Sequence, residues 1–176
     1  MQPQDHGIEM KDKIAGARIH LIGIGGAGML PLAIMLKQYG YVVSGEDDKL
    51  AQKARDILDR HEIAISTLRS LQSPDSLQTV VRSSAIRDQH PSVIEAAKRG
   101  CRILARGEQL AELVNDKRVM AIAGSHGKTS TCGILVDLLE SLGIYPCYLI
   151  GGLFSDAKDP GCWNESEWAC LLYTSD

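Results

Sequence analysis

Apolar residues in the first two thirds of the chain alternate between short β-rich runs and longer stretches with helical spacing. Strands are predicted at residues 17–23, 41–45, 63–66, 78–82 and 101–104. Helices are predicted at residues 29–39, 50–60, 91–99 and 108–114. Because strands and helices alternate across short connections, the pattern predicts an α/β fold built on a doubly wound parallel sheet.

The same alternation starts again after a polar stretch at residues 115–117. A strand at residues 118–123 leads through a glycine-containing loop into an amphipathic helix at residues 129–142, and a further strand is predicted at residues 144–150. We therefore expect two units, residues 1–115 and residues 116–176, although no Pro/Gly-rich linker marks the boundary.

Composition and charge narrow the possible functions. The 176 residues are 44% hydrophobic and 23% charged, as in soluble globular proteins, and the net charge of −3 gives no general attraction to nucleic acid or anionic membranes. No run approaches the ~20 apolar residues of a membrane span, and the polar N-terminus lacks a signal-peptide core. Five cysteines without a C-x-x-C pair favour ordinary thiols in a reducing cytoplasm. An anionic ligand would need a local cradle.

A glycine-rich loop follows the first predicted strand directly. Gly23, Gly25 and Gly28 fit the pattern G-x-G-x-x-G, and a helix follows at once, so the loop could bind a diphosphate with backbone N–H groups. The acidic residues 46–48 lie about twenty residues further on, where a ribose or base could be held. A packing turn is the alternative, and the loop alone does not specify the nucleotide.

Residues 82–87 follow the fourth predicted strand and contain two serines and two arginines. They would lie at the same sheet edge as the glycine loop and could grip a phosphate. The other interpretation is a capped turn with solvated arginines.

A second phosphate loop lies between the strand at 118–123 and the long helix. It has the pattern G-x-x-G-K-[ST], with Ile122 in place of the earlier glycine of a full P-loop. Lys128 could neutralise β/γ-phosphate charge and the Thr129 hydroxyl could bind Mg²⁺, whereas His126 could approach the nucleotide or face water. Together the two loops suggest a phosphorylated or nucleotide-linked substrate activated by ATP.

The chain resembles the Mur ligase family in residues 19–29, 44–47, 83–86 and 123–131 and at Gly151-Gly152, in the family's order and approximate spacing. The family's ATP loop also lacks the extra glycine. The resemblance implies an ATP- and Mg²⁺-dependent ligase of peptidoglycan precursor synthesis, joining L-alanine to the carboxylate of UDP-N-acetylmuramate through an acyl phosphate. It implies a Rossmann-like UDP-N-acetylmuramate-binding domain over residues 1–115 and the start of a P-loop α/β ATPase domain over residues 116–176.

The resemblance also assigns roles to individual residues. Those expected at the UDP-sugar are Gly25, Gly26, Ala27, Gly28 and Met29 at the diphosphate, Asp47 near the nucleoside, and Ser83 and Ser84 near the phosphates. Those expected at ATP are Gly124, Ser125, His126, Gly127, Lys128, Thr129 and Ser130. Lys128 would be catalytic, and Thr129 would bind Mg²⁺.

The chain departs from the family in its last part. The family's amino-acid-binding domain has no counterpart, and the family's acidic run would follow the strand expected after Trp168, so Glu165 and Glu167 receive no metal role. We expect the natural reading frame to end near Cys170 and the chain alone to be inactive. Alternatives are a murein tripeptide-adding ligase and a nucleotide-sugar- or NAD(P)-binding module without ligase activity. No protein partner is implied.

Overall fold

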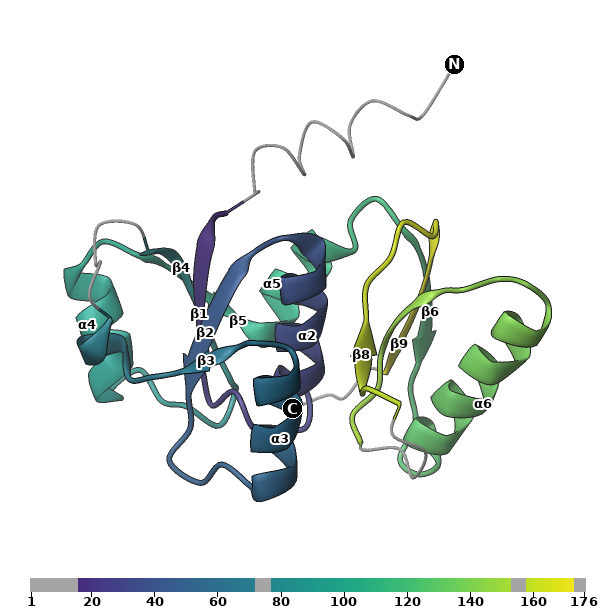
Figure 1. The fold of residues 1–176 in the computed structure, drawn as a ribbon, viewed down its shortest axis with the longest axis horizontal. Coiled ribbons are helices and arrows are strands. Elements are labelled where there is room, and N and C mark those ends of the chain that lie inside the picture. The colour runs from purple at the N-terminus through teal and green to yellow at the C-terminus, as the bar shows by residue number, and fades with distance from the viewer. Residues whose placement is uncertain (1–15, 72–76, 153–157, 173–176) are drawn as a thin grey trace, which may run out of the picture.

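The computed structural model describes residues 16–71, 77–152 and 158–172, and its strands form two open sheets (Figure 1). The first sheet has the order β3-β2-β1-β4-β5, and every pair is parallel. Its strands are β1 (Arg18–Ile22), β2 (Val42–Glu46), β3 (Ala64–Ile65), β4 (Leu77–Arg82) and β5 (Arg102–Ala105). Its helices are α2 (Met29–Tyr39), α3 (Gln52–Arg60), η1 (Leu68–Ser70), α4 (Pro91–Lys98) and α5 (Arg106–Leu113). The predicted parallel α/β fold is confirmed.

Helices cover both faces of this sheet. Helices α2, α3 and α5 pack on one face, and α4 packs on the other with η1 (Figure 1). Because β1 lies in the middle with β2 and β4 on either side, the chain reverses direction of travel across the sheet at β1. In such sheets ligands bind beyond the carboxyl ends of the strands near this reversal. The loops after β1, β2 and β4 all lie there.

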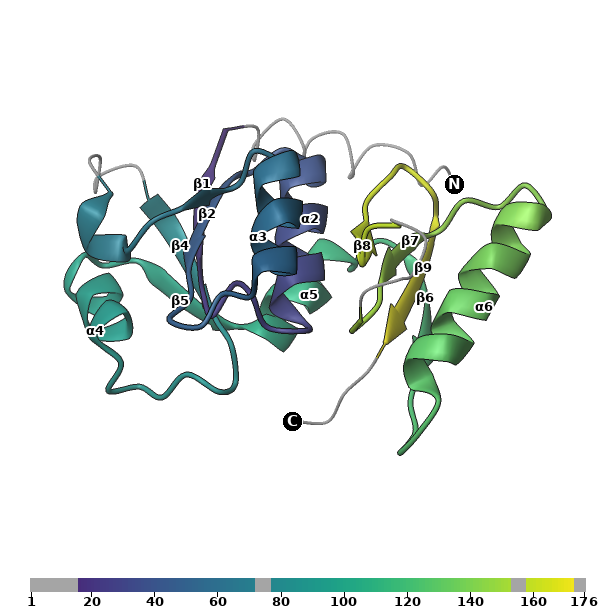
Figure 2. The same cartoon turned by 60° about the horizontal axis from the view of Figure 1, so that its bottom comes forward.

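The second sheet has the order β6-β9-β7-β8. Its elements are β6 (Arg118–Ile122), α6 (Lys128–Ser141), β7 (Cys147–Leu149), β8 (Gly161–Cys162) and β9 (Trp168–Leu172). Strands β6, β9 and β7 are parallel, whereas β8 pairs antiparallel with β7. Helix α6 covers one face, while the other face turns toward α2 (Figure 2).

Helix α2 is the element that both sheets share. All residues from 29 to 36 are buried, which fits a helix that is apolar on nearly every side. One side packs on the first sheet, and the other contacts β7 and β8. The approach is tight at Gly161, where a Cβ atom would lie only 2.3 Å from the carbonyl oxygen of Pro31. The backbones of α2 and β8 are therefore in direct contact.

Side chains reinforce this seam between the sheets. The backbone N–H of Trp163 donates to Gln38 Oε1 at 2.6 Å, and the Trp163 ring packs edge-on against Tyr39 with 4.8 Å between centroids. On the α3 side, His61 Nε2 lies 2.7 Å from Asp159 Oδ2. Polar and aromatic contacts thus hold the second sheet and its loops against α2 and α3.

Most predicted elements are present, with shifted ends. The helix predicted at 108–114 begins earlier, at Arg106, because Glu108 caps its start by accepting the Ala105 N–H at 2.7 Å. The strand predicted at 144–150 is only Cys147–Leu149, since Ile144 and Tyr145 stay exposed after the turn at Gly143. The strand expected after Trp168 is β9.

One strand was not predicted, and one expectation concerns a part of the chain that is not fully described. Strand β8 had no counterpart in the sequence prediction. The expectation that the natural reading frame ends near Cys170 concerns a tail of which residues 173–176 lie outside the described residues. Within the described ranges, no helix is long and apolar enough to cross a membrane.

Candidate functional site

The glycine loop is a tight turn between β1 and α2. Gly23 has a φ of +81°, a conformation that favours glycine. The backbone N–H groups of Gly23 and Ile24 both donate to the carbonyl oxygen of Glu46, at 2.8 and 3.1 Å. The loop is therefore anchored to the end of the neighbouring strand β2.

Asp47 holds the next residue of the loop. Its Oδ2 accepts the Gly25 N–H at 2.9 Å, and its Oδ1 accepts the Lys49 N–H at 2.9 Å. A Cβ at Gly25 would lie 2.7 Å from Leu50 Cδ1 and 3.0 Å from Asp47 Oδ2, so only glycine fits without displacement. The Gly25 N–H, expected at the diphosphate, is here used by the protein itself.

A cavity of about 240 Å³ lies between the glycine loop and the second sheet. We call it the inter-sheet cavity. It is lined by Gly26, Ala27, Gly28, Met29, Ser83, Ser84, Arg106, Leu149, Gly151 and Leu172. Six of the eight residues expected at the UDP-sugar thus lie around one space, to which the second sheet also contributes.

Asp47 lies at a neighbouring cavity of about 400 Å³, which we call the acidic cavity. Its lining includes Glu46, Asp47 and Asp48, together with Gly26 and Ser83, which it shares with the inter-sheet cavity. The two spaces therefore meet at the glycine loop. An elongated ligand could extend from one cavity to the other past Gly26.

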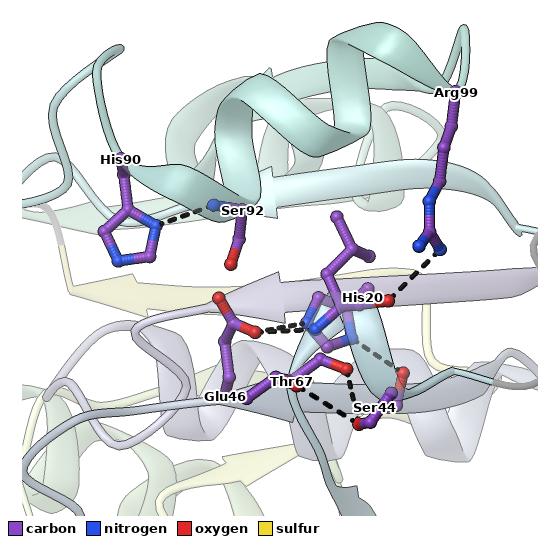
Figure 3. A network of polar contacts seen from close by, with 9 residues as sticks. His20, Ser44, Glu46, Thr67, His90, Ser92 and Arg99 are labelled. Atoms are coloured by element: carbon purple, nitrogen blue, oxygen red, sulfur yellow. Dashed lines mark hydrogen bonds and ion pairs between the residues drawn. The ribbon is translucent and has the colours of Figure 1, made fainter.

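Glu46, which lines the acidic cavity, belongs to a buried polar network (Figure 3). The fully buried His20 ring contacts Ser44 Oγ through Nδ1 at 2.9 Å and approaches Glu46 Oε2 to 3.6 Å. Glu46 Oε2 also accepts the Leu68 N–H at 2.7 Å. Burial alone would raise the pKa of the Glu46 carboxyl, but contacts with His20, the Ser92 hydroxyl and this N–H outweigh it and lower the pKa to about 2. Glu46 is a charged anchor for three segments around the site.

The turn after β4 combines the two interpretations of its sequence. Arg82 donates from Nη1 to the Ile86 carbonyl at 2.7 Å and pairs with Asp88, so this arginine caps the turn. The serines, by contrast, line the inter-sheet cavity. The hydroxyls lie where a phosphate could bind, and the Arg82 guanidinium is committed to the turn.

The second phosphate loop follows β6 and ends where α6 begins. Gly127 has a φ of +74° at the N-cap of α6, so the loop reverses sharply into the helix. Lys128 Nζ reaches back to the carbonyl oxygens of Gly124 at 2.7 Å and Ser125 at 3.4 Å. His126 and Thr129 are exposed. The loop thus presents backbone, one ammonium group and hydroxyls to solvent, a donor set that suits a nucleotide phosphate and a cation.

The segment Gly151-Gly152 lies between the two loops. A Cβ at Gly151 would be 3.9 Å from the Ala27 carbonyl oxygen, and a Cβ at Gly152 would be 3.0 Å from Thr129 Cγ2. The dipeptide therefore lies beside Ala27 of the glycine loop and beside Thr129, which follows the second loop at the start of α6. The two phosphate loops border a common region, although over 90 residues separate them in the sequence.

Sequence reasoning missed several residues that line the inter-sheet cavity, and the charged one among them is Arg106. It is the first residue of α5 and directly follows β5, at the same sheet edge as the glycine loop. No local pattern marks this position, because residues 105–107 lie between a predicted strand and a predicted helix. The rule that ligands bind beyond the carboxyl ends of parallel strands could have identified it.

Comparisons with known proteins agree with this arrangement. The sequence model described as "Mur ligase family, catalytic domain" matches residues 18–118. A UDP-N-acetylmuramate–L-alanine ligase from Anaeromyxobacter sp. is 40% identical over 136 residues, covering 77% of this chain and 30% of the relative. One from Pelagibacter ubique is 34% identical over 164 residues, covering 93% and 35%. The chain thus spans about a third of the length of these relatives.

Solved structures show the same fold. A UDP-N-acetylmuramate:L-alanyl-γ-D-glutamyl-meso-diaminopimelate ligase from Neisseria meningitides has a TM-score of 0.76 at 26% identity, covering 90% of this chain and 52% of that one. A UDP-N-acetylmuramate–alanine ligase from Thermotoga maritima has a TM-score of 0.76 at 23% identity, covering 88% and 37%. The family match covers more than half of the chain, and it agrees with the glycine loop and serine turn that line the site. The chain belongs to the Mur ligase family.

Proposed function

We propose that this chain carries the UDP-N-acetylmuramate site and the ATP loop of a ligase that joins L-alanine to UDP-N-acetylmuramate, forming ADP. The observation that carries the proposal is the position of Gly151-Gly152 beside both Ala27 and Thr129, because a ligase must bring a substrate carboxylate to the γ-phosphate of ATP. The names of the relatives from Anaeromyxobacter and Pelagibacter support the choice of substrates.

The first unit would bind the UDP-sugar. The backbone at residues 26–28 and the hydroxyls of Ser83 and Ser84 line the inter-sheet cavity, where they can donate to diphosphate oxygens. Gly25 and Met29 would shape the cavity instead, since the Gly25 N–H donates to Asp47 and Met29 is buried in the core. Asp47 would face the nucleoside from the acidic cavity.

The second unit would bind ATP with residues 124–130. Lys128, which now donates to two loop carbonyls, would transfer those hydrogen bonds to the phosphates and stabilise the transferred phosphoryl group. Thr129 would hold Mg²⁺, which when bound neutralises phosphate charge. In the proposed reaction the lactyl carboxylate attacks the γ-phosphate, and the alanine amine then displaces phosphate from the acyl phosphate.

In this proposal residues 1–115 bind the UDP-sugar and residues 116–176 bind ATP. The chain covers 30% and 35% of the two relatives described, so the site for L-alanine is assigned to the remainder of a full-length enzyme. Both substrates are small cytoplasmic metabolites in this proposal, which places the reaction in the cytoplasm.

The test is calorimetric titration of the full chain with UDP-N-acetylmuramate, NAD⁺ and Mg-ATP. We expect binding of the first and the third, whereas tight NAD⁺ binding without a response to the UDP-sugar would reject the proposal. Lys128→Ala should weaken ATP binding about tenfold or more and leave UDP-sugar binding intact. Lys98→Ala, an exposed position on α4, is the matched control. A parallel loss of both ligands in Lys128→Ala would contradict the two-site arrangement.

A further inference from the structure

The guanidinium of Arg106 lies directly against the glycine loop. A Cβ built at Gly28 would be 2.9 Å from Arg106 Nη1, 3.0 Å from Cδ and 3.1 Å from Cζ. These distances mean that the end of the arginine side chain rests on the bare backbone of Gly28, where α2 begins. Any larger residue at position 28 would have to push it away. The backbone at Gly28 is αR with φ of −97°, so conformation alone does not demand glycine there.

Arg106 also differs in charge from its surroundings. Among the described residues that line the inter-sheet cavity, it is the one with a formal charge, the others being glycines, apolar residues and two serines. The nearby Arg82 is held by Ile86 and Asp88 on the turn after β4. The chain as a whole carries a net charge of −3, which would repel a diphosphate. A cation at this cavity would offset that repulsion locally.

We propose that Arg106 binds the diphosphate of the UDP-linked substrate and that Gly28 is glycine because it admits the Arg106 guanidinium to that position. The inference rests on the proposed function for the identity of the substrate, and it deepens it by naming the residue that supplies the positive charge. The planar guanidinium can donate two parallel hydrogen bonds to diphosphate oxygens, and Ser83 and Ser84, which line the same cavity, can donate further ones.

The first test compares UDP and UMP as ligands of the full chain by calorimetric titration. Arg106→Ala should weaken UDP binding about 10- to 100-fold and UMP binding less, because charge-assisted hydrogen bonds to the second phosphate are lost. The UDP affinity of Arg106→Lys should lie between those of the native chain and Arg106→Ala, since an ammonium keeps the positive charge but cannot donate two parallel hydrogen bonds. The control is Arg102→Ala, which removes an arginine from the same strand–helix unit, where it pairs with Glu112 at the surface.

The second test moves Arg106 without removing it. Gly28→Ala places a methyl group where the guanidinium lies, so it should weaken UDP binding in the otherwise native chain. In an Arg106→Ala background the same substitution should have little further effect, because the group it displaces is gone. Additive losses in this double-mutant cycle would show that Gly28 acts independently of Arg106, and they would overturn the second half of the proposal.

The outcomes separate this inference from the proposed function. If the native chain binds UDP-N-acetylmuramate and Arg106→Ala binds UDP within twofold of it, the role of Arg106 is refuted and the proposed function stands. If the native chain binds neither UDP nor UDP-N-acetylmuramate, the proposed function fails and this inference fails with it. If Arg106→Ala does not fold, the same titrations are made with Arg106→Lys and Gly28→Ala, which keep a long side chain at position 106. Native UDP affinity in both variants would then refute the role of Arg106.

Discussion

Replacing Gly161 by alanine tests the seam between the two sheets. The new Cβ would lie 2.3 Å from the Pro31 carbonyl oxygen and 2.9 Å from two further backbone atoms of Pro31. Ordinary van der Waals contact begins near 3.4 Å, so α2 and β8 would have to separate by about 1 Å. Neither partner is the end of a flexible side chain, and the strain has to be relieved by movement of backbone.

The expected loss of stability in Gly161→Ala depends on whether α2 or β8 moves. Helix α2 is buried over residues 29–36, whereas β8 has only two residues and pairs with β7 alone. Strand β8 should therefore retreat, and overpacking of this kind costs about 1–3 kcal/mol. Its retreat also strains the hydrogen bond from Trp163 to Gln38, which contributes about another 1 kcal/mol. We expect a total loss of about 2–4 kcal/mol in the free energy of unfolding.

The assay is equilibrium unfolding in urea, followed by the fluorescence of Trp163 in the seam and Trp168 in β9. Gly107→Ala is the control, because its Cβ would meet nothing within 4 Å and alanine favours a helix. The control should be neutral or slightly stabilising. Even mild overpacking costs about 1 kcal/mol. If the free energy of unfolding of Gly161→Ala were within about 0.5 kcal/mol of the native value, below that minimum, the direct backbone contact would be refuted.

Two further substitutions probe the acidic side of the site. The pKa of Glu46 is lowered from 4.5 to about 2, so its charge stabilises the fold above pH 4.5, and this contribution, at most about 3 kcal/mol, is lost as the pH falls toward 2. As the pH falls from 4.5 to about 2, the urea midpoint of Glu46→Gln should therefore drop less than that of the native chain. If the two midpoints fell in parallel with pH, the anchor role of Glu46 would be contradicted. Asp47→Ala should cost about 1–2 kcal/mol and speed amide exchange at Gly25, because the carboxylate no longer accepts its N–H; unchanged exchange would disprove that role.

Local sequence patterns were sufficient for the first sheet. Strand β1, the glycine turn and α2 follow directly from a run of β-formers, four glycines and a long apolar stretch, and each signal lies within about ten residues. The serine turn after β4 lies at the same sheet edge as the glycine loop, as predicted, since its position depends only on the parallel order of the strands. Where a residue's place is set by its own segment, the sequence sufficed.

Features that depend on distant partners were not predictable in this way. Strand β8 is two residues long and exists because β7 pairs with it and α2 packs on it, so no periodicity marks it. Arg106 lies against Gly28, 78 residues earlier, and neither sequence segment alone predicts that proximity. The use of the Gly25 N–H by Asp47 is likewise a contact across 22 residues.

The burial of α2 between two sheets has a consequence for synthesis of the protein. Pro31 is covered by Gly161, which is translated 130 residues later. At about 5–20 residues per second, the side of α2 that faces the second sheet stays uncovered for roughly 7–26 s. During that interval the nascent chain presents an apolar helix surface, the kind of segment to which chaperones bind. The first sheet can form early, but its central helix is shielded only after β8 has left the ribosome.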